Sequence, residues 1–341
     1  MRAALRAAAA AFAALMAATA TAGAGDSAVV FLYHRFGENQ FPATSIRLDQ
    51  FEAQNAELKS GGYSVLPVPE ILAALQGGRP LPDNAVGITV DDTYRSVATQ
   101  AWPRLKAAGF PLTVFVATDP VDKGYPDYLT WDEIRALAKD GVTIGAHSAS
   151  HPHMADAPPG EIAGEIARSN ARLAEELGFV PEIFAYPYGE ASLALRGYVG
   201  GSGYKFAFGQ HSGVISGQAD FLNLPRFALN ENYGEIGKFR ERARALPLAV
   251  RDFTPADPLV ADDNPPAIAF SVDPETKGIE KLACFGSERE GLTLTRTENS
   301  RFEIKLPAPL APGRFRLNCT MPADQGRYRW FGAAFYVPAR R

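Results

Sequence analysis

Short apolar runs alternate with helical patterns along most of the chain, from Val29 to about Arg251. Runs such as 29–33, 86–90 and 142–146 are typical of buried strands, and several of the helical patterns end at a glycine. This alternation predicts βα units and a mainly parallel sheet. Roughly six to eight such units favour a (β/α) barrel, closed or incomplete, in which residues at the carboxyl ends of the strands face the active site.

The pattern changes near residue 252. Four prolines punctuate a polar stretch, 252–266, which we interpret as a linker. Beyond it, 267–341 contains short alternating segments that predict a small all-β, sandwich-like domain of roughly 75 residues. The expected organisation is therefore a catalytic α/β domain over 25–251, the linker, and the β-sandwich.

The N-terminus has the features of a cleavable secretory signal over 1–24. Arg2 and Arg6 precede an apolar, alanine-rich run, and small residues follow it. The alternative is an uncleaved membrane anchor, but the run is shorter than the ~20 residues that a span needs. We therefore expect a periplasmic or secreted protein with no membrane span after cleavage. In such an oxidising compartment Cys284 and Cys319 are expected to form a disulfide, and two buried free thiols are the alternative.

Composition is that of an ordinary soluble globular protein, with 46% hydrophobic and 21% charged residues in 341. The formal net charge is -4 and no run of lysine or arginine occurs. The sequence therefore argues against a nucleic-acid partner.

Two short stretches carry most of the candidate chemistry. Asp91 and Asp92 end one apolar run, and His147 and His151 follow another. Two acids at the end of a buried strand are costly unless their charge has a partner, and a divalent cation supplies one. One carboxylate and two imidazoles can hold the metal while the other carboxylate acts as a base, which is the equipment of metal-assisted hydrolysis. The alternatives are a helix cap before Ser96 for one acid and two surface histidines on a polar loop.

Three segments in this order resemble the motifs of the polysaccharide deacetylases, the NodB-homology group of carbohydrate esterases. Residues 89–92 read T-V-D-D where the family has T-F-D-D, and 147–151 read H-S-A-S-H against H-[S/T]-x-x-H. Residues 185–188 read A-Y-P-Y against R-x-P-Y. The resemblance covers about 28–246.

This resemblance implies a distorted (β/α) barrel of about seven strands and a role for each matching residue. Asp91 would be the general base, and Asp92, His147 and His151 would hold the metal, usually zinc and sometimes cobalt, nickel or iron. The backbone N–H of Tyr188 would help to form the oxyanion hole.

The chain departs from the family pattern at three positions. Val90 replaces phenylalanine, Thr93 replaces the usual glycine, and Ala185 replaces the arginine that orients the catalytic aspartate. The third departure leaves the support of the base unassigned. Candidate substitutes are Arg35, Arg95 and Arg226.

The general acid is not fixed by a clear motif. His211 is our first candidate and His34 the second, while His153 is either a supporting group or a solvated loop residue. The alternative for each is a lone histidine satisfied by the backbone. Trp131 is a candidate for the barrel rim, although a packed tryptophan at a helix start explains it equally well. The expected substrate-binding residues are His34, Arg35, Trp131, Tyr186 and Pro187.

Segments 33–35 and 184–189 are most similar to exported bacterial members, some of which act on biofilm poly-N-acetylglucosamine. We therefore predict removal of N-acetyl groups from such a polysaccharide. The alternatives are an O-acetyl polysaccharide esterase and a non-catalytic carbohydrate-binding protein. In the C-terminal domain Tyr328, Trp330 and Phe331 either stack on glycan or fill the core. That domain could instead dock to an exopolysaccharide-secretion partner.

Overall fold

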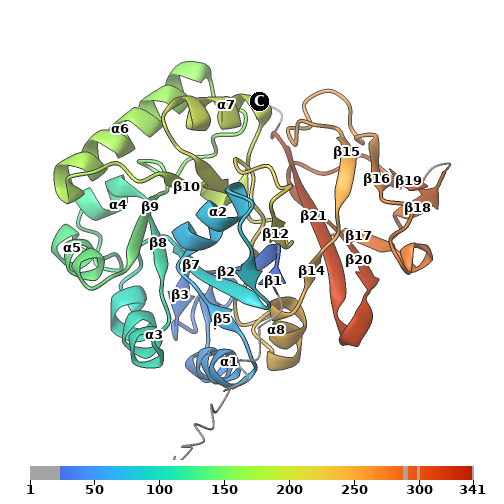
Figure 1. Cartoon of the computed structure of the whole chain (residues 1–341). Helices are drawn as coiled ribbons and strands as arrows, with labels where there is room; N and C mark the ends of the chain where they lie inside the picture. The colour runs from blue at the N-terminus through green and yellow to red at the C-terminus, as the bar shows by residue number, and fades with distance from the viewer. Residues whose placement is uncertain (1–23, 287–290, 298–299, 340–341) are drawn as a thin grey trace, which may run out of the picture.

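The computed structural model describes residues 24–286, 291–297 and 300–339. The expected signal segment thus lies almost entirely outside the described residues. Figure 1 shows two parts side by side, an α/β part and a smaller all-β part. Within the described ranges no helix combines the length and apolarity needed to cross a membrane.

The first part is a curled, mainly parallel sheet of nine strands flanked by helices. Seven of the strands follow one path, on which only β12 runs antiparallel to its neighbour β2. The expected distorted barrel is thereby confirmed. In path order these strands are β11 (Phe206–Phe208), β10 (Ile183–Ala185), β9 (Thr143–Ala146), β8 (Thr113–Val116), β7 (Ala85–Asp91), β2 (Ser27–Tyr33) and β12 (Ile215–Ser216). Off this path, β13 (Phe227–Ala228) pairs with β2, and β5 (Ser64–Val65) pairs with β7.

The helices cover the outside of this sheet and start and stop where local sequence dictates. Thr130 and Glu133 form a capping box at the start of α5, and left-handed glycines end α3 and α6 at Gly109 and Gly178. The helices are α1 (Leu48–Ser60), α2 (Val68–Gln76), α3 (Trp102–Ala108), α4 (Thr118–Asp122), α5 (Trp131–Lys139), α6 (Pro159–Leu177), α7 (Leu193–Gly201) and α8 (Ile236–Ala243). Two small two-stranded sheets join β1 (Ala24–Gly25) to β6 (Leu81–Pro82) and β3 (Arg35–Phe36) to β4 (Ser45–Ile46).

The second part is a sandwich of two four-stranded sheets, as the sequence pattern predicts. One sheet has the order β14 (Leu246–Pro247), β21 (Tyr328–Val337), β20 (Gly313–Pro322) and β17 (Ala283–Gly286). The other has the order β15 (Val250–Thr254), β16 (Ile268–Val272), β19 (Arg301–Lys305) and β18 (Thr293–Arg296). Buried Phe270, Leu317 and Phe335 belong to the core between the two sheets. A disulfide joins Cys284 to Cys319, which are paired neighbours on β17 and β20.

The junction between the two parts lies earlier than the sequence suggests. Strands β14 and β15 already pair with strands of the sandwich, so the expected linker 252–266 begins inside β15. Two-residue and five-residue strands carry too little periodicity to be recognised in a proline-rich stretch. The parts are in close backbone contact, because a Cβ at Gly332 of β21 would lie 1.9 Å from the carbonyl oxygen of Ser212.

Candidate functional site

The acids and the first histidine stand at the carboxyl ends of strands that are close together in the sheet. Strand β7 ends at Asp91, β9 ends just before His147, and β8 lies between them. Parallel strands bring their carboxyl ends to one edge, so residues 55 positions apart in the chain meet there. This edge is where the sequence placed the site.

Asp92, His147 and His151 form a group that could hold a metal ion. Their candidate ligand atoms all lie within 4.8 Å of one another. The Oδ1 atom of Asp92 is 3.8 Å from Nε2 of His147 and 3.7 Å from Nε2 of His151. One carboxylate and two imidazoles are a ligand set that suits zinc and related divalent metals.

The environment of His147 fits this role. Its ring is fully buried, and Nδ1 lies 2.7 Å from the carbonyl oxygen of Ala185, which can accept only from an N–H. That bond leaves the lone pair on Nε2, which is buried and has no hydrogen-bond partner among the described residues. Burial lowers the pKa of His147 to about 4, which keeps the ring neutral at pH 7. A buried, unpaired nitrogen facing a carboxylate is what a metal-binding histidine requires.

The backbone around the ligands is held in an unusual conformation. Four non-glycine residues at this site have a positive φ, between 56° and 61°. Such conformations cost roughly 1–3 kcal/mol each and gather where side chains must be aimed at a ligand. The residues are Asp92, Ser148, His151 and Tyr188.

Asp91 is held by a buried arginine. Nη1 and Nη2 of Arg226 donate to the two carboxylate oxygens of Asp91 over 2.6 and 2.7 Å, and neither side chain is exposed. Burial alone would raise the pKa of Asp91, but Arg226 and then His147 outweigh it and lower the pKa to about 2. Asp91 is therefore ionised and oriented at neutral pH, as a general base must be.

Of the three arginines considered as substitutes for Ala185, only Arg226 reaches Asp91. It stands directly before β13, and its guanidinium also lies over the rings of Phe115 and Phe208. The other two arginines are paired elsewhere. Arg35 pairs with Glu38, and Arg95 pairs with Glu133.

Of the candidates for the general acid, His34 and not His211 lies beside Asp91 and Asp92. A pocket of about 720 Å³ is lined by His34, Asp92 and His151, together with Tyr188. Burial lowers the pKa of His34, while the charges of Asp91 and Asp92 act in the opposite direction. His34 follows β2, the strand adjacent to β7, which explains why it reaches the acids.

Our first candidate for the acid, His211, faces another cavity. Its neighbour Gln210 lines the pocket, with Nε2 3.4 Å from a carboxylate oxygen of Asp91. The chain bends at Gln210 and His211, and His211 lines the cavities on the sandwich side and not this pocket. His153 contacts the site indirectly, because Nδ1 lies 2.7 Å from Glu190 and its ring stacks on Tyr188 at 4.1 Å.

Tyr188 lies in a tight turn, Pro187–Gly189, directly after β10. Its ring packs against His151 and His153, with ring centroids 4.5 and 4.1 Å away. Nη1 of Arg314, on β20 of the sandwich, donates to the carbonyl oxygen of Tyr188 over 2.8 Å. The second part of the chain thus supports the turn whose N–H the family resemblance assigns to the oxyanion hole.

The other expected substrate-binding residues do not line this pocket. The hydroxyl of the buried Tyr186 donates to the carbonyl oxygen of Leu222, and Pro187 is buried. Arg35 lies against the ring of Tyr94. Arg35 and Pro187 are adjacent in sequence to the pocket residues His34 and Tyr188, but their side chains point elsewhere.

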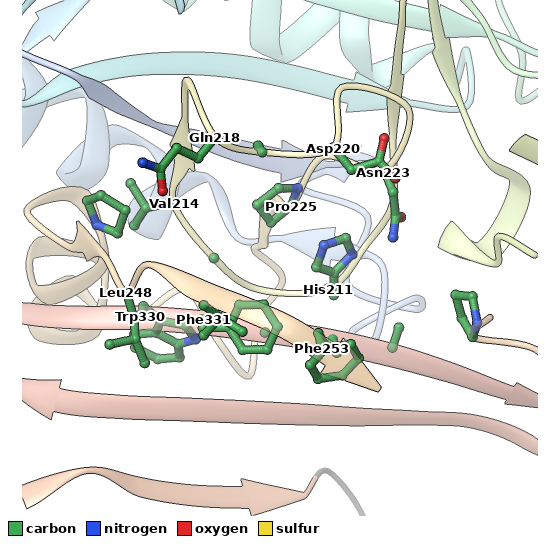
Figure 2. Close-up of a pocket in the computed structure, with 18 of the residues that line it drawn as sticks. His211, Val214, Gln218, Asp220, Asn223, Pro225, Leu248, Phe253, Trp330 and Phe331 are labelled. Atoms are coloured by element: carbon green, nitrogen blue, oxygen red, sulfur yellow. The ribbon is translucent and has the colours of Figure 1, made fainter. Parts of the chain in front are cut away.

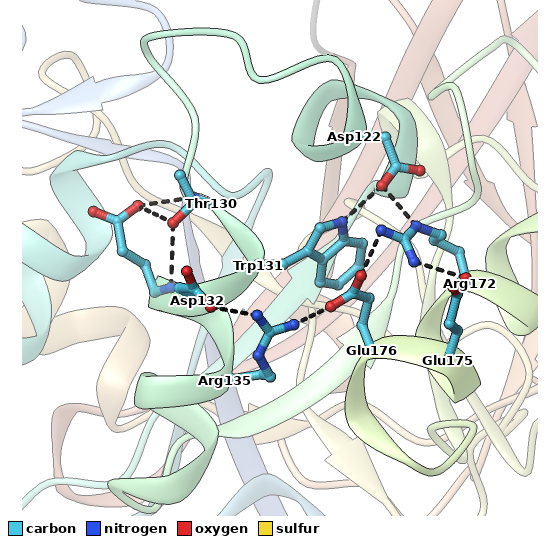
Figure 3. Close-up of polar contacts among 9 residues, drawn as sticks. Asp122, Thr130, Trp131, Asp132, Arg135, Arg172, Glu175 and Glu176 are labelled. Carbon is cyan, nitrogen blue, oxygen red and sulfur yellow. Dashed lines mark hydrogen bonds and ion pairs between the residues drawn. The ribbon is translucent and has the colours of Figure 1, made fainter.

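Trp131 instead joins three helices, as Figure 3 shows. Its Nε1 donates to Asp122 over 2.7 Å, and Arg172 of α6 lies over the indole ring. Arg135 pairs with Asp132 and Glu176 beside it. The explanation as a packed tryptophan at a helix start is therefore the correct one.

Several pocket residues were missed from the sequence. The pocket wall carries tyrosines on loops, and no shared motif in the sequence points to them. They are Tyr94, Tyr125, Tyr128 and Tyr233. Arg314 and Arg316 of β20 also line the pocket, and no local pattern links the sandwich to it.

Comparisons with known proteins agree with this geometry. Residues 78–207 match the family model described as polysaccharide deacetylase. The poly-beta-1,6-N-acetyl-D-glucosamine N-deacetylase of Escherichia coli K12 is 24% identical over 231 residues, covering 55% of this chain and 34% of that protein. The chain thus spans about a third of that relative's length. The enzyme of the same name from Staphylococcus aureus MSSA476 is 23% identical over 214 residues, covering 59% of this chain and 73% of its own length.

Solved structures share the barrel. IcaB from Ammonifex degensii has a TM-score of 0.56 at 26% identity, covering 65% of this chain and 99% of that one. The Streptococcus pyogenes deacetylase PplD, solved in complex with acetate, has a TM-score of 0.59 at 23% identity, covering 64% and 98%.

Proposed function

Because the chain belongs to the polysaccharide deacetylase family, we propose that it is a metal-dependent hydrolase that removes N-acetyl groups from a polysaccharide such as poly-N-acetylglucosamine. The observation that carries the proposal is the buried, unpaired Nε2 of His147 facing Asp92, next to an Asp91 that Arg226 keeps ionised. The names of the relatives support the choice of N-acetyl groups and of this glycan.

Asp92, His147 and His151 would hold the metal. When bound there, a divalent metal polarises a carbonyl and lowers the pKa of water. Zinc suits this ligand set best, and cobalt, nickel or iron are alternatives.

Asp91 would take the proton from the attacking water. It is adjacent to the ligand Asp92, and the two hydrogen bonds from Arg226 fix the direction of its carboxylate. Gln210 lies 3.4 Å from the same carboxylate and limits its rotation further. A base held in this way needs no reorganisation when the reaction begins.

The N–H of Tyr188 would donate to the developing oxyanion. The positive φ of Tyr188 sets the direction of this N–H, and the hydrogen bond from Arg314 to the Tyr188 carbonyl holds the turn. A fixed donor of this kind is typically worth about 10²–10³ in rate.

His34 would give a proton to the departing amine. Of our candidates for the acid it is the one that shares the pocket with Asp92 and His151. The tyrosines of the pocket wall would contact the sugar, since aromatic faces suit the apolar face of a pyranose ring.

The alternative of a non-catalytic binding protein rested on the missing arginine at position 185 and on the unassigned general acid. Arg226 supplies the contact that this arginine would make, which favours an enzyme. O-deacetylation would use the same residues, because only the leaving atom differs. The N-terminal segment and the disulfide support a periplasmic or secreted location, with a secretion complex as a candidate partner.

The test is acetate release by the mature protein, loaded with zinc, cobalt or nickel, from β-1,6-linked N-acetylglucosamine oligomers, chitin oligomers and acetylated xylan. Asp91→Asn should abolish release, while Asp262→Asn, at an exposed position of the second part, should not. Release from xylan alone would establish the esterase instead. No release from any glycan, with one equivalent of metal bound, would overturn the proposal.

A further inference from the structure

A second cavity lies between the barrel and the sandwich, apart from the catalytic pocket. Its volume is about 320 Å³, at the small end of the range typical of small-molecule sites. Figure 2 shows His211, Gln218, Asp220 and Asn223 on the barrel side, across the cavity from the strands of the sandwich. Neither part of the chain forms this cavity alone.

The sandwich side of the cavity is aromatic. Phe253 of β15 and Trp330 and Phe331 of β21 line it, and Figure 2 shows their rings along that wall. The rings are fixed, because Nε1 of Trp330 donates to Asn318 over 3.0 Å and the Phe253 and Phe331 centroids are 5.3 Å apart. Of the three C-terminal aromatics singled out from the sequence, Trp330 and Phe331 border this cavity and also pack into the cores on either side of it, Trp330 against Phe227 and Phe331 against Phe270.

The barrel side is polar, and three of its side chains have donors and acceptors available for a ligand. The side chains of Gln218 and Asn223 and the ring of His211 make no hydrogen bond to another side chain or to the backbone within the described ranges. His211 is only 6% exposed, so a ligand in the cavity is its main source of partners. A buried ring like that of His211 is normally satisfied, whereas Gln218 is exposed and Asn223 is half-buried.

The charges of the cavity are balanced. Arg196 donates to Asp220 over 2.7 Å, so each neutralises the other. Burial, and then the charges of Arg196 and Arg226, lower the pKa of His211 to about 4, so the ring is neutral at pH 7. A free anion would find no unpaired cation here, and a free cation would find no unpaired carboxylate. A purely apolar ligand would leave the polar side without partners.

An apolar flat wall opposite a neutral polar wall matches a sugar ring, which has a face of C–H groups and a rim of hydroxyl and amide groups. We propose that the interdomain cavity is a second binding site for a neutral saccharide unit, held by Trp330 and Phe331 on one side and His211, Gln218 and Asn223 on the other. The choice of N-acetylglucosamine as that unit rests on the proposed function.

The interdomain cavity lies near the catalytic pocket. A cavity of about 20 Å³, room for about one water molecule, lies between the two. Tyr188 and Gln210 line this smaller cavity and the pocket, while His211 and Asn223 line it and the interdomain cavity. A glycan unit bound between the two parts would thus lie next to the chain segment that also contacts the catalytic base.

The test uses the full mature chain without metal, so that no turnover occurs, and N-acetylglucosamine oligomers of one to four units as the probe. Binding is followed by calorimetry and by the indole N–H signals in a nitrogen-15 spectrum. The chain has three tryptophans, and a Trp330→Phe variant identifies the signal of the residue in the cavity. We expect the Trp330 signal to shift with sugar, while those of Trp102 and Trp131 stay in place.

Removing polar partners should weaken this binding. A Gln218→Ala/Asn223→Ala double variant should bind about tenfold less tightly, since each neutral hydrogen bond contributes modestly. The matched control is Gln76→Ala, at the exposed end of α2, which should bind as the parent does. An unshifted Trp330 signal at saturating sugar, or a preference for glucosamine or uronic-acid oligomers, would overturn the proposal.

This experiment is independent of the catalytic one. A shift of the Trp330 signal without any acetate release in the metal-loaded enzyme would reject the deacetylase and keep the saccharide site. Acetate release with an unshifted Trp330 signal would support the deacetylase and reject the saccharide site.

Discussion

Arg226 and Asp91 form a bidentate, fully buried ion pair between residues 135 positions apart in the chain. The pair sits under the candidate metal site, and Thr89 and Gly209 accept the remaining hydrogen bonds of the guanidinium. It takes the place of the arginine that the family carries at position 185. The contact to Asp91 is therefore made from the residue directly before β13 and not from the end of β10.

Loss of Arg226 should affect both stability and catalysis. Arg226→Ala leaves a buried carboxylate unpaired, so the free energy of unfolding should fall by about 3–5 kcal/mol. A misdirected base should lower kcat by roughly 100-fold. Urea unfolding measures the loss of stability, and acetate release measures the loss of kcat. Arg226→Lys should restore the positive charge but not the bidentate contact with Asp91.

A second-site change makes this prediction specific. Ala185 is fully buried in the cluster that holds Phe115 and Phe208, the rings that flank the guanidinium of Arg226. Ala185→Arg alone should destabilise the chain by overpacking. Combined with Arg226→Ala, it should restore part of the lost kcat. A double variant no more active than Arg226→Ala would show that position 185 cannot support the base.

The sequence was sufficient to predict the barrel and to bring together the acids and histidines of the candidate site, because these lie in short motifs at the ends of strongly apolar strands. Asp91, Asp92, His147 and His151 are each fixed by the strand that precedes them. The sandwich was also predictable, since its strands alternate with period two.

Long-range contacts could not be predicted in the same way. Whether Arg35, Arg95 or Arg226 would reach Asp91 depends on how distant strands pack, and all three follow plausible strand ends. Gln210 and His211 show that the prediction is also limited at the level of single residues. A shift of one position along the chain decides which of the two side chains faces Asp91. The contribution of Arg314 depends on how two separate domains dock, on which local pattern carries no information.

The metal should contribute to stability as well as activity. A ligand that binds only the folded chain raises its stability by about 2.7 kcal/mol at a concentration 100 times its Kd. Adding zinc to the chelated protein should therefore raise Tm, and His147→Ala should remove both this rise and the bound equivalent of metal. His211→Gln is the comparison, since His211 lies in another cavity. A zinc-dependent rise in Tm that survives His147→Ala would place the metal elsewhere.

His34 should matter most when the leaving group needs a proton. His34→Gln should lower kcat on N-acetylglucosamine oligomers by about 10²–10⁴. With 4-nitrophenyl acetate, whose leaving group departs without protonation, the loss should be much smaller. Parallel rates on the two substrates measure this difference. An equal loss on both substrates, or the same pattern in a His211 variant instead, would exclude His34 as the acid.

Arg314 should act through the Tyr188 turn. Without the 2.8 Å hydrogen bond to the Tyr188 carbonyl, the turn is freer and its N–H is less well aimed. Arg314→Ala should lower kcat by about tenfold with little change in KM, because an oxyanion donor acts mainly in the transition state. Arg314→Lys should recover part of this loss. The control is Arg251→Ala, an exposed arginine of β15. An increase in KM at constant kcat would instead indicate that Arg314 binds the glycan.

Stability should depend on pH through His211. Burial lowers its folded-state pKa from 6.5 to about 4, so below pH 6.5 the unfolded chain binds the proton more readily. The contribution of the neutral ring is fully present above pH 6.5 and is lost as pH falls toward 4, up to about 3 kcal/mol. His211→Gln should flatten this part of the stability curve, measured as urea unfolding of the metal-free protein between pH 7.5 and 4.5. The buried His147 contributes in the same direction, so the slope should fall in part and not vanish. If His211→Gln had the same slope as the parent, the buried ring of His211 would not contribute to the acid sensitivity.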